Sequence, residues 1–101
     1  MQSYINEFVA LYVPTLTVVS YTIQTADNIN SVYIYNNTVS VNIGVNNRDY
    51  LVSTWFVKPG ENLLIEGQDL QKINAPLIIY ADNIGPNNPP QTINIIIKRY
   101  V

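Results

Sequence analysis

The side chains that could do chemistry in this sequence are its acids, and the usual bases do not accompany them. The chain has no His and no Cys, so it lacks the commonest general base, the commonest metal ligand and any thiolate nucleophile. The acids stand mostly at turns or strand ends, where carboxylates are ordinarily solvated. They are Glu7, Asp27, Asp49, Glu61, Glu66, Asp69 and Asp82. The sequence therefore predicts no catalytic carboxylate pair and no enzyme.

Other chemical sites need combinations that are absent here. Without His, only a Lys could activate a Ser, and no Ser-x-x-Lys spacing occurs. Phosphate-cradling loops need clustered glycines, whereas the glycines of this chain are scattered. Asp69 and Asp82 could join loop carbonyls around a hard cation, but the dense Asp spacing of a calcium loop is missing. We therefore expect no cofactor and no metal.

The low charge of the chain restricts its partners. Only 12% of the residues are charged, against about 25% in typical domains, and the net charge is −2. No basic cluster is large enough to neutralise several phosphates, so we expect no nucleic-acid partner. No stretch approaches the ~18 apolar residues of a membrane span, so we expect no membrane insertion. The surface is made soluble by neutral polar side chains, Asn above all, so copies of the chain repel each other only weakly. Such a surface is compatible with ordered self-association.

The apolar pattern has a period of two almost throughout, which is typical of half-buried strands. Val39, Val41 and Ile43 alternate with small polar residues, and Ile93, Ile95 and Ile97 do so near the C-terminus. Eight strands are predicted, at about residues 5–13, 15–25, 31–36, 38–45, 49–57, 62–66, 76–82 and 91–100. A short helical turn within residues 66–74 is the one helical candidate. This pattern predicts an all-β, eight-stranded antiparallel sandwich, of jelly-roll type or, alternatively, immunoglobulin-like.

One domain spans residues 1–101, and residues 1–7 are a candidate arm that is flexible or exchanged with a neighbouring copy. Asn tolerates tight turns, so Asn36-Asn37 and Asn46-Asn47 are expected to close two successive hairpins. Asn36-Asn37-Thr38 also matches the glycosylation acceptor pattern. Residues 83–90, rich in proline, are expected to form an exposed loop. The expected core is Phe8, Val19, Tyr21, Ile23, Val32, Ile34, Val39, Val41, Ile43, Leu51, Leu63, Ile65, Leu77, Ile79, Ile93, Ile95 and Ile97.

The aromatic residues, 11% of the chain, are the most informative candidates for binding. Tyr33 and Tyr35 share the outward face of a short strand. Trp55 and Phe56 are adjacent, so one of them must point outward; Trp55 either covers a sheet edge or loop base, or anchors a protein or sugar. Ile96 is an aliphatic residue on the polar face of the last strand. The candidate interface or ligand contacts are Tyr33, Tyr35, Tyr50, Trp55, Phe56 and Ile96.

A series of segments follows a recognisable order along the chain. It runs from an aromatic-Val-Pro segment at 11–14, through strands at 16–24 and 31–45, to a Pro-Gly-Glu turn and strand at 57–63 and an apolar strand at 77–81. This order resembles small virion structural proteins, especially head-decoration and tail-associated jelly rolls of phages. The resemblance implies a capsid, decoration, penton-like or tail-associated component. It would be made in the host cytoplasm, reside in the virion, and act by self-assembly or by docking onto other virion proteins.

Two other functions are open at this point. A carbohydrate- or receptor-binding module, acting at an extracellular surface, would place Trp55, Tyr33, Tyr35 or Tyr50 in a shallow site with Asn and Asp partners. A fibre or pilus subunit would be completed by strand exchange, with residues 1–7 as the exchanged arm. The first seven residues lack the basic start and apolar core of a secretion signal. Such a chain stays in the cytoplasm, leaves by a route without a classical signal, or is a mature or excised fragment.

Overall fold

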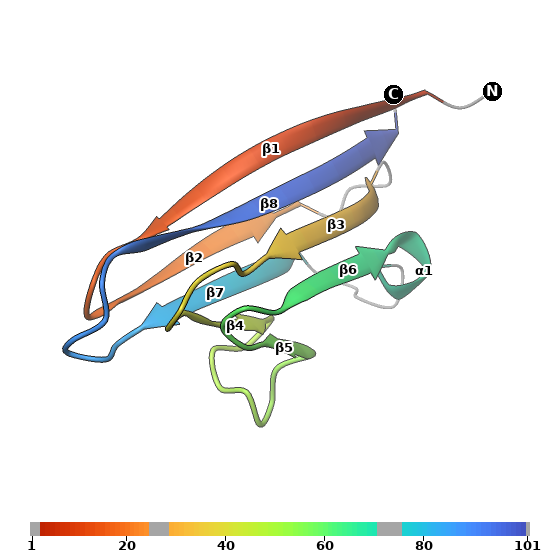
Figure 1. Cartoon of the computed structure of the whole chain (residues 1–101). Coiled ribbons are helices and arrows are strands. Elements are labelled where there is room, and N and C mark those ends of the chain that lie inside the picture. The colour runs from red at the N-terminus through yellow and green to blue at the C-terminus, as the bar shows by residue number, and fades with distance from the viewer. Residues whose placement is uncertain (1–2, 25–28, 71–75, 101) are drawn as a thin grey trace.

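Strand formation follows the alternation of β-branched and polar residues. The computed structural model describes residues 3–24, 29–70 and 76–100 and forms eight strands and one helical turn within them (Figure 1). These elements are β1 (Tyr4–Val13), β2 (Thr17–Ile23), β3 (Ile29–Tyr35), β4 (Asn42–Val45), β5 (Trp55–Val57), β6 (Asn62–Glu66), α1 (Gly67–Leu70), β7 (Leu77–Asn83) and β8 (Gln91–Tyr100). The turn α1 lies inside the stretch expected to be helical, and residues 71–74 of that stretch lie outside the described residues.

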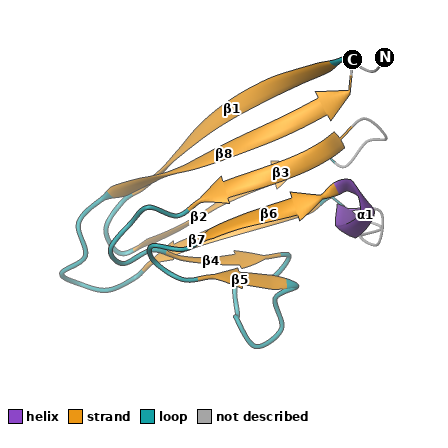
Figure 2. Cartoon of the chain, turned by 45° about the vertical axis from the view of Figure 1, so that its right-hand side comes forward, coloured by secondary structure: helices purple, strands orange, loops and turns teal. Residues whose placement is uncertain are grey.

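The strands form two four-stranded antiparallel sheets that face each other as two layers (Figure 2). The strand orders are β1–β8–β3–β6 and β2–β7–β4–β5. Apart from β4 and β5, consecutive strands lie in different sheets, which is the double Greek key of a jelly roll. The predicted jelly-roll sandwich is therefore confirmed. In an immunoglobulin-like sandwich the first two strands share a sheet, whereas here β1 and β2 do not.

The core lies between the inner faces of the two sheets. Its fully buried residues include Ile34, Ile43, Ile79 and Ile95, each of which alternates with outward-facing neighbours. Most of the expected core residues are buried, and Val19, Tyr21 and Leu63 pack partly buried against them. The structure adds Val13, Ile29, Val45, Val57 and Ala81 to the core.

For three residues the prediction that they lie in the core is wrong. Phe8 is 73% exposed because β1 pairs with β8 in a register that sets Phe8 beside Ile96, on the outer face. Val39 is exposed in the segment between β3 and β4. Leu51 is 74% exposed because residues 49–54, expected to begin a strand, belong to a loop that runs from β4 to β5.

The hairpin expected at Asn36-Asn37 does not form, because β3 and β4 belong to different sheets. Asn36 is instead fully buried where the chain crosses between the layers. Its side-chain amide donates hydrogen bonds to the carbonyls of Val41 at 2.7 Å and Lys58 at 3.1 Å, and its Oδ1 accepts one from Thr38 at 2.6 Å. The folded chain therefore does not present Asn36 to a glycosylating enzyme.

The second Asn pair lies in a hairpin, but it does not close a tight turn. β4 pairs with β5, and residues 46–54 connect them. Asn46 has a positive φ of 68° and ties the base of this loop to β7: its backbone amide donates to the Ile78 carbonyl at 2.7 Å, and its Oδ1 accepts from the Ile78 amide at 3.1 Å. Residues 83–90, apart from Asn83 in β7, form the expected loop.

The candidate arm is part of the sandwich where the structure describes it. Residues 4–7 form the first part of β1 and pair with residues 97–100 of β8 in the same chain. Met1 and Gln2 lie outside the described residues.

Candidate functional site

An apolar row crosses the outer face of the β1–β8–β3–β6 sheet. The strand register places Phe8 beside Ile96, Ile96 beside Tyr33, and Tyr33 beside Leu64, so one such residue comes from every strand. Leu64 is 47% exposed, and Tyr35 follows on the same face of β3. We call these five residues the aromatic face. Exposed side chains of this size on a sheet are typical of an interaction surface.

The two tyrosines of the aromatic face interact with each other. The ring centroids of Tyr33 and Tyr35 lie 4.3 Å apart with the planes tilted by 51°. Electrostatic interaction with Tyr33 raises the pKa of the Tyr35 phenol, and desolvation and a hydrogen bond with Tyr33 add to this rise. The Tyr35 phenol is therefore neutral near pH 7 and adds contact area without adding charge.

Polar residues border the aromatic face. On one side, the cross-strand row contains Lys98, Ser31 and Glu66. The Lys98 ammonium lies 4.3 Å from the centre of the Tyr4 ring, a cation–π contact. The face thus combines an apolar centre with one positive and one negative charge at its border, an arrangement like that of protein interfaces.

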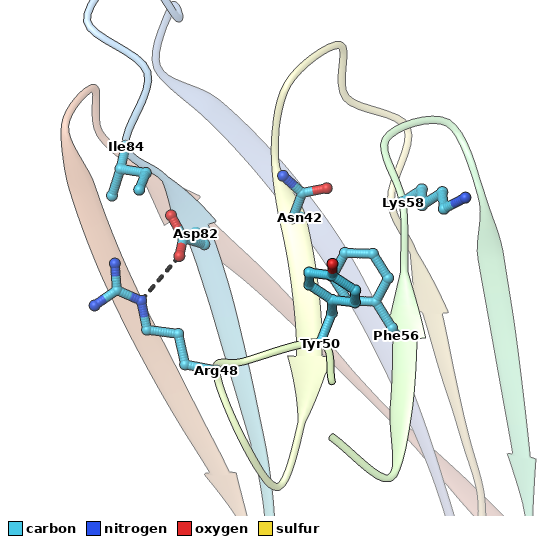
Figure 3. A pocket seen from close by; sticks show the side chains of 7 residues that line it. All are labelled: Asn42, Arg48, Tyr50, Phe56, Lys58, Asp82 and Ile84. Atoms are coloured by element: carbon cyan, nitrogen blue, oxygen red, sulfur yellow. Dashed lines mark hydrogen bonds and ion pairs between the residues drawn. The ribbon is translucent and has the colours of Figure 1, made fainter. Parts of the chain in front are cut away.

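An open groove of about 660 Å³ lies on the outer face of the opposite sheet, formed by β2, β7, β4 and β5. Its lining residues come from β4, β5, β7 and the loops beside them (Figure 3). They are Asn42, Arg48, Tyr50, Phe56, Lys58, Asp82 and Ile84. One wall is aromatic, because the rings of Tyr50 and Phe56 lie with their centroids 5.3 Å apart at 45°.

The groove exists because the β4–β5 loop folds back over its own sheet. Gly44 allows this approach, since a Cβ at that position would overlap the carbonyl oxygen of Asn47. Asp49 stabilises the loop itself: its Oδ1 accepts from the Leu51 amide at 3.0 Å, and its carbonyl accepts from the Ser53 amide at 2.9 Å. These local bonds and the Asn46 bonds to β7 hold the loop in place.

The groove carries three charged groups. The Arg48 Nε donates to Asp82 Oδ2 at 2.9 Å, which links the loop to β7 (Figure 3). The other oxygen, Asp82 Oδ1, is buried and has no hydrogen-bond partner. Lys58 forms no ion pair with any residue in the described part of the chain. A buried acceptor without a donor is uncommon in folded proteins.

The candidate contacts predicted from the sequence fall on three different parts of the molecule. Tyr33, Tyr35 and Ile96 lie on the aromatic face, and Tyr50 and Phe56 lie in the groove. Trp55 is beside the buried Val45 and packs against the core. The adjacent pair therefore points Trp55 inward and Phe56 outward.

Seven residues of these two surfaces were missed. They are Phe8 and Leu64 on the aromatic face, and Asn42, Arg48, Lys58, Asp82 and Ile84 in the groove. Phe8 and Leu64 were missed because both faces of their strands carry apolar side chains. Arg48 and Asp82 are 34 positions apart in sequence, so no local pattern pairs them.

Asp69 and Asp82, considered together as cation ligands, do not meet. Asp69 lies in α1, which packs on β3 and β6, whereas Asp82 lies in β7 beside the groove. Among the residues that the structure describes, no group of three or more acidic side chains is arranged to hold a metal ion. The described residues also contain no helix with the length and apolar character needed to cross a membrane.

Comparison with known proteins adds no family. No protein-family model matches the chain, and no curated protein matches it. Function must therefore be argued from the fold and from the two surfaces.

Proposed function

We propose that this chain is a structural component of a virus particle and that it assembles with copies of itself through the aromatic face. Jelly rolls are common in viral capsid subunits, although lectins and cupins share the fold, so the fold supports this function by analogy alone. The observation that carries the proposal is the apolar row that joins all four strands of one outer face. It is better suited to burial against another protein than to water.

The row is complementary to itself. Two copies stacked face to face, with a two-fold axis running along the strands between β8 and β3, bring Phe8 against Leu64 of the second copy. The same operation brings Ile96 against Tyr33 of the second copy, because β8 and β3 exchange places. At the border, Lys98 meets Ser31 of the second copy, so no two like charges are brought together.

The free energy that this contact contributes to self-association can be tested with a matched pair of variants. Phe8→Ser and Leu51→Ser each remove an apolar side chain of similar exposure, 73% and 74%, the first from β1 and the second from the β4–β5 loop. Full burial of one such side chain contributes about 1.5–3 kcal/mol, and a two-fold interface buries Phe8 twice. Phe8→Ser should therefore weaken self-association by about 3–6 kcal/mol, a hundredfold or more in Kd.

Light scattering across a hundredfold range of concentration would measure this effect. We expect closed oligomers of the wild type and of Leu51→Ser, and dissociation of Phe8→Ser. A wild type that stays monomeric at every concentration would contradict self-assembly. Docking onto a different protein would then be the remaining way for the chain to join a particle. Open polymers that grow with concentration would instead favour the fibre or pilus function.

The presence of the chain in virus particles needs a measurement separate from that of self-association. In cells that produce the virus, the chain should co-sediment with nuclease-resistant particles and be detected in them by mass spectrometry. A chain that stays in the soluble fraction while particles sediment would contradict the virion part of the proposal.

A further inference from the structure

We propose that the groove beside the β4–β5 loop binds a carboxylate-bearing saccharide, such as a uronic or sialic acid residue. This inference concerns the sheet opposite the aromatic face, so it does not depend on self-assembly. It rests on three features of the groove: an aromatic wall, a buried acceptor that lacks a donor, and two cations beside them.

The aromatic wall fits the apolar side of a sugar ring. Tyr50 is 60% exposed and its ring leans on Phe56, so the two rings form a tilted platform that faces the groove. Binding sites commonly combine such aromatic surface with a few fixed polar groups. The C–H groups on one side of a pyranose ring supply an apolar surface that can lie on this platform.

The unpaired oxygen of Asp82 requires a donor. An ionised carboxylate only accepts hydrogen bonds, so its partner must bring an O–H or N–H group. Oδ2 is already held by Arg48, and Oδ1 is buried without a partner. A donor on a ligand in the groove reaches Oδ1 when the Asp82 side chain, which is 20% exposed, turns toward the groove. A sugar hydroxyl donates and accepts at once, and Asn42 on the neighbouring strand β4 offers further polar groups across the groove.

The two cations select for an acidic sugar. Arg48 and Lys58 outnumber Asp82, the one acid among the lining residues, so the lining carries a formal charge of +1 in a chain whose net charge is −2. Arg48 uses its Nε toward Asp82 and is half exposed, which leaves the outer guanidinium nitrogens for another anion. Hydrogen bonds between such cations and a ligand carboxylate are charge-assisted and stronger than neutral ones.

The loop is organised for binding before a ligand arrives. The Asn46 bonds to Ile78 and the turn at Asp49 fix its path, and the Arg48–Asp82 pair anchors its middle to β7. A site held in place in this way loses little conformational freedom when it binds.

Titration of the isotope-labelled protein followed by NMR would test the inference. The probes are methyl glucuronide and the methyl glycoside of N-acetylneuraminic acid. Methyl glucoside is the uncharged control ligand, and glucose 6-sulfate is the control ligand whose charge is a sulfate. We expect at least one of the two carboxylate sugars to shift amides of the groove with a Kd on the order of 1 mM, as expected for a small ligand on an open site. Methyl glucoside should bind at least tenfold more weakly.

Variants with matched controls complete the test. Tyr50→Ala and Lys58→Gln should each weaken binding of the carboxylate sugar about tenfold or more. Tyr12→Ala and Lys98→Gln remove equivalent groups from the opposite sheet and should leave binding unchanged. Dispersed amide spectra would show that each variant is folded.

Several results would overturn the inference. They are no shift at tens of millimolar of either carboxylate sugar, equal affinity for methyl glucoside, binding of the sulfated sugar alone, or binding that survives Tyr50→Ala. Shifts confined to the aromatic face would also overturn it.

Discussion

Replacement of the buried Asn36 by Ala probes the crossing between the two sheets. The change removes the donor to the carbonyls of Val41 and Lys58 and the acceptor for the Thr38 hydroxyl. The Lys58 carbonyl keeps a second donor, the Glu61 amide at 3.0 Å, so the main losses fall on Val41 and Thr38. Each buried polar group left without a partner costs about 1–3 kcal/mol.

The expected loss of unfolding free energy is therefore about 2–6 kcal/mol, a large part of the roughly 5–15 kcal/mol of a typical domain. With an m-value of about 1.5 kcal/mol per molar, the midpoint of urea unfolding should fall by about 1–4 M. Asn37→Ala is the matched control, because Asn37 is the exposed neighbour, and it should change stability by no more than about 0.5 kcal/mol. All curves are recorded at one protein concentration, since association adds to apparent stability.

Asn36→Asp separates hydrogen bonding from cavity formation, because it keeps the shape and removes the amide donor. The new carboxyl can donate to Val41 only when it is protonated, so folding should raise its pKa above the unfolded value. The variant should lose least stability, relative to wild type, below about pH 4, and more as pH rises through the folded-state pKa. Equal midpoints for Asn36→Ala and Asn37→Ala would refute this account of the crossing.

Two further variants test local features of the two surfaces. Gly44→Ala should lower the unfolding midpoint by an equivalent of about 1–3 kcal/mol, since its Cβ would overlap the Asn47 carbonyl oxygen and push the loop off the sheet; an unchanged midpoint in urea would contradict the close approach. Tyr33→Phe should lower the pKa of the Tyr35 phenol toward its ordinary value, because Tyr33 is the main cause of the rise; a ring-carbon NMR titration in which that pKa does not move would contradict the assigned cause.

The sheet architecture could be predicted from the sequence because alternation is a local signal. Ile93, Ile95 and Ile97 alternate with outward-facing residues, and all three are buried. The strand ends at 62–66 and 91–100 were also predicted correctly. Eight short strands without helices leave few architectures to choose from, and a jelly roll is one of them.

Pairing between distant strands could not be predicted, because it depends on contacts across the chain. In β1 both Phe8 and Val9 belong to apolar alternating sets, so only the register with β8 decides which of them faces inward. Asn is a residue type that favours turns, which led to the prediction of a hairpin at Asn36. In the structure Asn36 is a buried donor to the carbonyls of Val41 and of Lys58, and Lys58 is 22 positions away. Local preference for a turn was overridden there by the Greek-key connection.

The candidate contacts show the same division between local and distant information. The outward positions of Tyr33 and Tyr35 follow from alternation with the buried Val32 and Ile34. That Phe56 meets Tyr50 follows from the fold-back of the loop, which in turn depends on Gly44 and on Asn46. No short pattern carries that information.

Cross-linking between two single-cysteine variants would test the face-to-face contact most directly. Asn6→Cys and Glu66→Cys each introduce one thiol at an end of the border row that contains Lys98 and Ser31, so the apolar row stays intact. The chain has no other Cys, so no cross-link can form within a chain. Stacked sheets lie about 10 Å apart, beyond the roughly 7 Å Cα separation that a disulfide spans, so a short bismaleimide is the suitable reagent.

The account predicts a cross-linked dimer when the two variants are mixed, and little product from either variant alone, because the two-fold axis sets Asn6 against Glu66 of the second copy. Dimer from the mixture at no more than the level of the single variants would contradict assembly through the aromatic face.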